Sequence, residues 1–190
     1  MPPTREKSAV SQPRITRWRL SIFISTWLSY AGYYFCRKPF YNAKGTLNED
    51  LGFSTTQLAN IGTGYLTTYA VGQFSSAAVG TWLGPRKMVL MGMMVSLLTN
   101  ATMGSWAGFA SLLSMMLLNG LAQATGWPGN IGVMAAWTRR DERGTVMGVW
   151  STCYQVGGLL ASFLAAYLIG AQGWRAAFFG GAAVLLVVWV

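Results

Sequence analysis

Residues 20–40 read LSIFISTWLSYAGYYFCRKPF, an apolar, aromatic and hydroxyl-bearing run that two adjacent cations, Arg37 and Lys38, interrupt near its end. About 20 largely apolar residues suffice to cross a bilayer as a helix. A charge within a bilayer costs several kcal/mol, so a cation there usually faces a water-filled cavity and marks a ligand path. Arginine keeps its proton, and its planar fork suits phosphate or carboxylate. The run therefore predicts an anion site inside a membrane protein.

A position at the membrane surface is the alternative for the two cations. Arg37 follows Trp18 by about twenty residues, so it can also lie where the helix leaves the bilayer. Tyrosines gather at that level too, in an aromatic belt. Depth along the helix therefore leaves both positions open.

The composition of the whole chain is that of a membrane protein. Hydrophobic residues make up 53% and charged residues 10% of the 190 residues, against about 25% charged residues in soluble domains. We predict an all-α, polytopic fold in which a tail, residues 1–17, precedes a six-helix transmembrane domain, residues 18–190. The predicted transmembrane helices cover residues of about 18–42, 56–79, 87–104, 109–135, 144–170 and 174–190. The last run reaches Val190 without a polar flank, so we expect a continuation that is missing from this chain.

Basic residues are distributed unevenly around these helices. Lys and Arg in short loops mark the cytoplasmic side of a membrane protein. Ten of the fourteen lie in the tail and in two loops on one side. They are Arg5, Lys7, Arg14, Arg17, Arg19, Arg86, Lys87, Arg139, Arg140 and Arg143. The net charge of +9 therefore predicts a cytoplasmic N-terminus rather than a nucleic-acid partner.

Several local signals predict how the helices begin, end and pack. Pro39 should distort the first helix, which we expect to end near Lys44 and Gly45, before an outer loop. Ser54 and Gln57 have the spacing of a capping box that opens the next helix. Small residues four apart allow two helices to approach closely. These are Ser76, Gly80 and Gly84, Gly104 and Gly108, Gly120 and Ala124, and Gly144 and Gly148.

One face of the first helix combines aromatic hydroxyls with the arginine. At about 100° per residue, the members of this stripe fall close together. They are Phe23, Thr26, Tyr30, Tyr34, Arg37 and Tyr41. Such a face can stack on a sugar or bond its hydroxyls while Arg37 holds an anionic end. Lys38 lies on the adjacent face, as a second charge or as a side chain that reaches outward.

Acidic residues and histidine are absent from the predicted spans. The five carboxylates, at positions 6, 49, 50, 141 and 142, fall in the tail or the loops, and the chain has no histidine. Proton-coupled carriers typically need such a relay within the membrane, so the visible chain favours exchange of anions, unless the missing part supplies a carboxylate. No Ser-His or Cys-His pair and no metal cluster is present, which excludes the common enzyme classes and predicts no cofactor. Cys36 and Cys153 fall within predicted spans, and we expect both to be buried and to form no disulfide.

Residues 30–40, YAGYYFCRKPF, the Gly-Trp-Pro at 126–128 and residues 137–158 are similar, in this order, to motifs of one family. They resemble the first helix, the fourth helix and the helix four–five connection of the organophosphate:phosphate antiporters of the major facilitator superfamily. That family includes glycerol-phosphate and hexose-phosphate exchangers and a hexose-phosphate sensor. The resemblance spans nearly the whole chain. It implies the N-terminal six-helix half of a twelve-helix transporter, whose C-terminal half is missing here.

The resemblance also implies a set of substrate-binding residues. By position, six residues match those that line or border the family's central cavity, and Arg37 is one of two phosphate-binding arginines, the other lying in the missing half. The six are Tyr30, Tyr34, Arg37, Lys38, Trp127 and Trp150. Gln73 stands where the glycerol-phosphate exchanger has a lysine, and Tyr154 where it has a histidine. These two departures leave open a less charged or bulkier sugar derivative, or a sensing role.

The loops that secure one conformation in the superfamily also depart from its pattern. Thr81 and Trp82 occupy the places of the usual Asp-Arg pair between the second and third helices. Arg86, Lys87 and Arg143 remain to make other contacts in the cytoplasmic loops. Family drift and altered cycling, as in a receptor, both fit this change.

Together these features predict a carrier of the inner (plasma) membrane, not an enzyme. It would exchange a sugar phosphate or glycerol phosphate for inorganic phosphate by alternating access. Its partners would be these anions, the lipid bilayer and the missing half. The alternatives are a membrane-embedded sugar-phosphate sensor or receptor and a carrier of another organic anion.

Overall fold

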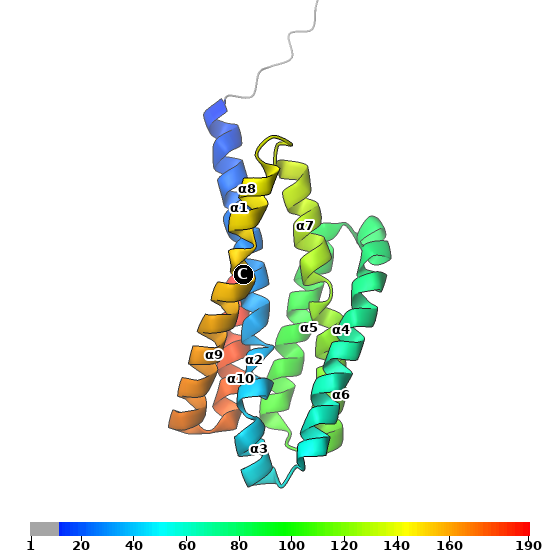
Figure 1. Cartoon of the computed structure of the whole chain (residues 1–190), viewed down its shortest axis with the longest axis vertical. Helices are drawn as coiled ribbons and strands as arrows, with labels where there is room; N and C mark the ends of the chain where they lie inside the picture. The colour runs from blue at the N-terminus through cyan, green and yellow to red at the C-terminus, as the bar shows by residue number, and fades with distance from the viewer. Residues whose placement is uncertain (1–11) are drawn as a thin grey trace, which may run out of the picture.

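Helices occupy all six ranges that the sequence predicts as spans, and three of these ranges are interrupted. The computed structural model describes residues 12–190, in which there are helices and turns but no strand (Figure 1). The helices are α1 (Gln12–Phe35), α2 (Lys38–Asn42), α3 (Lys44–Leu51), α4 (Thr55–Leu83), α5 (Pro85–Ser105), α6 (Phe109–Gln123), α7 (Gly126–Trp137), α8 (Arg143–Trp150), α9 (Thr152–Gln172) and α10 (Trp174–Trp189). Most of the predicted tail, residues 1–17, lies outside the described residues.

The long helices run up and down side by side (Figure 1). The start of α1, the α4–α5 turn and the α7–α8 connection lie at one end, which we call the basic end after its arginines. Helix α3 and the α5–α6 and α9–α10 turns lie at the other, the α3 end (Figure 1). This alternation is that expected of a chain that crosses a layer repeatedly.

Two of the three interruptions lie one turn before a proline. Proline lacks an N–H and its ring clashes with the carbonyl four residues earlier. Those carbonyls belong to Phe35, ahead of Pro39, and to Ala124, ahead of Pro128, and the helices end at or next to them. At the first break the Arg37 N–H donates to the Tyr34 carbonyl at 3.0 Å, a tighter turn than in an α-helix.

The prediction that the first helix ends near Lys44 and Gly45, before an outer loop, was wrong. The chain does not leave the helical conformation near residue 45; α3 extends to Leu51 and closes on Gly52, whose φ is +67°. Leu47 is fully buried, so packing stabilises a helix where polarity suggested a loop. The capping box of Ser54 and Gln57 is confirmed, with both reciprocal hydrogen bonds formed.

Helices α4 and α6 approach closely where small residues meet. A Cβ added to Gly72 would lie 2.6 Å from the Cβ of Ala124, and one added to Gly120 would lie 2.6 Å from the Tyr65 carbonyl oxygen. The predicted close packing at Gly120 and Ala124 is therefore confirmed. It brings the middle of α4 and the end of α6 against the break in α1.

Buried apolar residues form two clusters with this break between them. One, towards the α3 end, includes Phe40, Leu47, Met116 and Phe178. The other includes Tyr33, Met93 and Trp150, together with Cys36 and Cys153, which are free thiols and buried as predicted.

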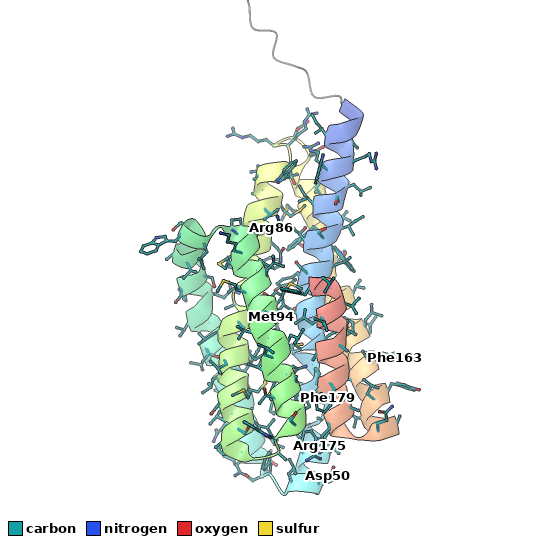
Figure 2. The ribbon with its side chains drawn as sticks, turned by 180° about the vertical axis from the view of Figure 1, so that it is seen from behind. Asp50, Arg86, Met94, Phe163, Arg175 and Phe179 are labelled. Carbon is teal, nitrogen blue, oxygen red and sulfur yellow. The ribbon has the colours of Figure 1, made fainter. Side chains whose placement is uncertain are left out.

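In the part of the chain that the structure describes, two helical segments are long and apolar enough to cross a membrane by themselves. They are Pro85–Ser105 and the α8–α9 segment Arg143–Gln172, while Trp174–Trp189 is apolar but shorter. Large apolar side chains also face outwards, such as Phe74 on α4 and Phe163 on α9, which are 85% and 74% exposed. Phe163 points away from the bundle in Figure 2. That all six ranges cross a bilayer stays a prediction.

Candidate anion-binding site

Arg37 lies in the two-residue break between α1 and α2, and its side chain is directed at α4 and α6. Its Nε donates to the Gln123 side-chain oxygen at 2.9 Å. Its guanidinium carbon lies 4.6 Å from the ring centroid of Tyr34, 4.9 Å from that of Tyr69 and 5.7 Å from that of Tyr65. Aromatic faces attract a cation at such distances. The buried Nη2 has no hydrogen-bond partner in the described part of the chain.

No carboxylate pairs with this guanidinium within residues 12–190. The two ion pairs recorded there are Arg19 with Glu142 at 2.6 Å and Arg139 with Asp141 at 3.0 Å, both at the basic end. Figure 2 places Asp50 at the far end of the bundle from Arg86. Arg37 is half-buried and its Nη2 is fully buried. A charge removed from water is normally paired, and residues 12–190 do not supply the counter-charge.

A network of buried amides and hydroxyls surrounds the break. The Gln123 oxygen also accepts from the Tyr65 hydroxyl at 3.0 Å. The Gln123 nitrogen has two hydrogens and lies within hydrogen-bond distance of three acceptors, the Tyr33 carbonyl at 3.2 Å, Ser96 Oγ at 3.1 Å and Asn119 Oδ1 at 3.1 Å. Asn119 in turn donates to the Cys36 carbonyl at 2.9 Å. We call Ser96, Asn119 and Gln123 the amide network.

Five of the predicted binding residues meet where α1 packs against α7 and α9. We call Tyr30, Tyr34, Trp127, Trp150 and Tyr154 the aromatic cluster. Tyr30 lies 5.2 Å from Trp127, 5.9 Å from Trp150 and 6.0 Å from Tyr34, measured between ring centroids. Trp127 lies 5.4 Å from Trp150 and 6.5 Å from Tyr154. The structure therefore brings these side chains together, although it does not test what they bind.

Lys38 and Gln73 lie apart from Arg37. Lys38 is half-buried and faces α9, where a Cβ on Gly158 would lie 3.7 Å from its Cε. Gln73 is half-buried on α4, one turn beyond Tyr69, and makes no side-chain hydrogen bond within the described residues. The structure records no contact of either side chain with the guanidinium.

The predicted loop residues behave differently from one another. Arg86 and Lys87 are exposed at the start of α5 and form no ion pair in residues 12–190. Arg143 donates through Nη2 to the Ala135 carbonyl at 2.9 Å and the Thr138 carbonyl at 3.4 Å, and so satisfies the C-terminus of α7. Arg19, which the sequence did not single out, donates to the Trp137 carbonyl at 3.0 Å.

Sequence reasoning missed the residues that hold Arg37 in place. Tyr65 and Tyr69 are four apart on α4, and Asn119 and Gln123 are four apart in the otherwise apolar α6. Polar side chains at that spacing lie on one helix face, and polar groups are costly within a membrane. That pattern could have marked both pairs as facing a common polar site.

Comparisons with known proteins agree with this arrangement of motifs. A family model described as Major Facilitator Superfamily matches residues 22–190. The chain is 35% identical to a probable hexose phosphate transport protein of Chlamydia pneumoniae, over 92% of this chain and 38% of that protein. It is 31% identical to the glycerol-3-phosphate transporter of Bacillus subtilis, over 90% of this chain and 40% of that protein. It is 32% identical to sugar phosphate exchanger 3 of Xenopus laevis, over 81% of this chain and 37% of that protein. The chain thus spans well under half of the length of these relatives.

Proposed function

This chain belongs to the Major Facilitator Superfamily, and from that premise we propose that the full protein exchanges a phosphorylated small metabolite for inorganic phosphate. Membership in this superfamily indicates a membrane transporter rather than an enzyme. Relatives named for transport of hexose phosphate, glycerol 3-phosphate and sugar phosphate support this substrate class. The membrane is the inner (plasma) membrane.

The observation that carries the proposal is the state of Arg37. Within residues 12–190 it is a cation without a carboxylate partner, and its buried Nη2 has no hydrogen-bond acceptor there. Phosphoryl oxygens accept charge-assisted, potentially bidentate hydrogen bonds from a guanidinium. Three tyrosine rings line the same guanidinium. The anionic end of the substrate binds here.

The organic part of the substrate lies against the aromatic cluster. Aromatic faces stack on sugar rings, and the hydroxyl groups of the cluster bond polar substituents. Tyr154 is 38% exposed, which suits a residue that borders a cavity. Lys38 supplies a second charge on the α9 side, and Gln73 shapes the cavity further along α4.

The titratable residues of the chain favour exchange of anions over proton symport. The chain has no histidine, and in the described residues every carboxylate lies at an end of the bundle or in a loop. The site therefore lacks a group in this segment that would take up a proton with the substrate. Each anion is instead exchanged for another.

A second half completes the carrier. Relatives more than twice as long support a C-terminal six-helix half that supplies the facing wall and a second arginine. The two halves rock about the midplane site to give alternating access. Arg86, Lys87 and Arg143 lie in the loops of the basic end, and Arg86 lies far from Arg175 in Figure 2. This distribution supports a cytoplasmic N-terminus.

The test is exchange in proteoliposomes that contain the full natural polypeptide. Vesicles loaded with labelled phosphate are challenged with external phosphate, glycerol phosphate, hexose phosphates or plain carboxylates. We expect efflux that depends on an external phosphorylated compound, and a loss of at least about 100-fold in Arg37→Ala, since two charge-assisted hydrogen bonds are removed. Arg175→Ala, which removes an exposed cation stacked on Trp174, is the matched control.

Three other outcomes would contradict this function. Specific binding of a sugar phosphate without flux would identify a receptor. Exchange of carboxylates that free phosphate does not inhibit would identify a carrier of other organic anions. Full exchange by Arg37→Ala at normal expression would show that the site is wrongly assigned.

A further inference from the structure

The side chain of Gln123 contacts Arg37 within the α1 break and the Tyr33 carbonyl just before it, and it is completely buried. We infer that Gln123 is a positioning residue that sets the Arg37 guanidinium for its anion. The inference rests on the proposed function of Arg37. It concerns a residue on α6 that supports the binding group and does not touch the substrate.

The orientation of the Gln123 amide is fixed by its partners. Its oxygen faces Arg37 Nε, which can only donate, and the Tyr65 hydroxyl. Its nitrogen faces the Tyr33 carbonyl, which can only accept. An inverted amide would set two donors against each other at Arg37 and two acceptors at Tyr33. The oxygen therefore has to point at the guanidinium.

The rest of the amide network supports the same direction of donation. Ser96 Oγ donates to Asn119 Oδ1 at 2.6 Å, so the hydroxyl oxygen accepts from Gln123. Asn119 Oδ1 accepts from both, and the Asn119 nitrogen donates to the Cys36 carbonyl. Donors and acceptors match along the whole path from the α1 break to Arg37. A buried network with matched donors and acceptors restrains the side chains that form it.

One consequence is that the guanidinium presents its Nη edge to the ligand in a fixed orientation. With Nε bound by Gln123, the two Nη groups are left for a ligand, and buried Nη2 has no other partner in residues 12–190. The rings of Tyr34 and Tyr69, at 4.6 and 4.9 Å, limit its rotation. A pre-oriented group binds with less loss of conformational freedom.

A second consequence concerns charge. An amide fixes the arginine without neutralising it, whereas a carboxylate at the same place would form an ion pair and compete with the anion. The position therefore requires a neutral acceptor. This requirement separates a positioning role from a purely structural one.

The test is equilibrium binding of labelled inorganic phosphate to the purified full-length protein at pH 7.5 and pH 5.5. Gln123→Glu, Gln123→Leu and wild type are compared at each pH, so that titration of phosphate itself cancels. Asn130→Asp makes the same amide-to-carboxyl change at another buried residue, which bonds Ser29 and the Gly126 carbonyl and does not contact Arg37. Thermal unfolding of each variant reports whether it is folded.

We expect Gln123→Glu to bind phosphate about tenfold more weakly than wild type at pH 7.5. The deficit should persist at pH 5.5, because pairing with Arg37 favours the charged form of the new carboxyl. Gln123→Leu should be about tenfold weaker at both pH values, and Asn130→Asp should bind phosphate within about threefold of wild type at both.

Wild-type affinity in both Gln123 variants, or an Asn130→Asp deficit as large as that of Gln123→Glu, would overturn the inference. If Gln123→Glu does not fold, Tyr65→Phe takes its place, since it frees the amide oxygen of one donor while keeping the ring. It should weaken phosphate binding about threefold, and unchanged binding would overturn the inference. Absence of phosphate binding by wild type would instead overturn the proposed function.

Discussion

The two sides of the α1 break are built from different chemistry. Towards α4 and α6, Arg37 meets the amide network, in which each hydrogen bond has a fixed direction. Towards α7, α8 and α9, the rings of the aromatic cluster pack against one another at tilted angles. The cluster is also held by a hydrogen bond that Trp150 Nε1 donates to the Thr26 hydroxyl at 3.1 Å. Tyr34 belongs to the cluster and also lies 4.6 Å from the Arg37 guanidinium, so the two regions meet at this ring. We propose that the first recognises charge and the second recognises shape.

This difference determines how substitutions should act. A change on the amide side alters the guanidinium and affects every phosphorylated ligand equally. A change on the aromatic side alters contacts that inorganic phosphate does not make, so it affects selectivity. Changes outside both sides should affect stability alone.

The largest effect is expected from Gly120→Ala, which separates α4 from the amide side. The added Cβ would meet the Tyr65 carbonyl oxygen at 2.6 Å and the Thr68 hydroxyl, and backbone cannot yield easily. We expect a loss of about 2 kcal/mol of stability, measured as a lower thermal unfolding midpoint of the full-length protein. Gly170→Ala, where nothing lies within 4 Å, is the matched control and should be close to neutral. Equal midpoints for both variants would contradict the close packing.

Trp127→Ala should break the aromatic side while leaving the amide side intact. Trp127 contacts Tyr30, Trp150 and Tyr154, and stacking of this kind contributes about 0.5–1.5 kcal/mol. We expect organophosphate affinity to fall about tenfold and phosphate affinity to change by less than about twofold. Competition of each compound against labelled phosphate measures this. An equal loss for both would show that the two sides are not separate.

Trp150→Phe should lower the stability of the protein by removing one hydrogen bond from the aromatic cluster. It removes the hydrogen bond to Thr26 and leaves a fully buried ring in place. The expected cost is about 1 kcal/mol of stability, with phosphate affinity unchanged. Chemical or thermal unfolding would measure the cost. A selective loss of phosphate binding would show that Trp150 acts on the phosphate site, and would contradict its assignment to the aromatic cluster alone.

Arg19→Gln should have the smallest effect, since it lies at the basic end outside both sides. It removes an ion pair with Glu142 whose side chains are 29% and 39% exposed. Exposed pairs of this kind contribute less than about 1 kcal/mol. Unfolding at low and high salt should reveal a small difference that salt removes. A large loss of exchange would instead give this contact a part in the transport cycle.

Much of the fold could be predicted from sequence because hydrophobic length and proline act locally. The six helical ranges, the capping box at Ser54 and the distortion near Pro39 follow from such signals. The interruption at Ser151 has no proline. There, side-chain hydroxyls bond nearby carbonyls, Ser151 to Met147 at 2.8 Å and Thr152 to Val149 at 2.8 Å, in competition with the helix. Serine and threonine are common in helices, so their presence alone did not predict a break.

The site was half predictable for a similar reason. Tyr30, Tyr34 and Arg37 share a helix face, so periodicity alone groups them. The contact of Arg37 with Gln123 joins residues 86 positions apart in the chain. It depends on how α6 packs against the break, which a single sequence does not reveal. Lys38, adjacent to Arg37, turns to α9 for the same reason.

The central claim is that the planar fork of Arg37, rather than positive charge at the break in general, binds the phosphoryl group. Reciprocal substitutions at the two neighbouring cations test it directly, through binding of labelled phosphate to the full-length protein. Arg37→Lys keeps the charge but loses the fork, and we predict at least about tenfold weaker binding, with Lys38→Arg within about threefold of wild type. Wild-type affinity in Arg37→Lys, or a greater loss in Lys38→Arg, would contradict the account.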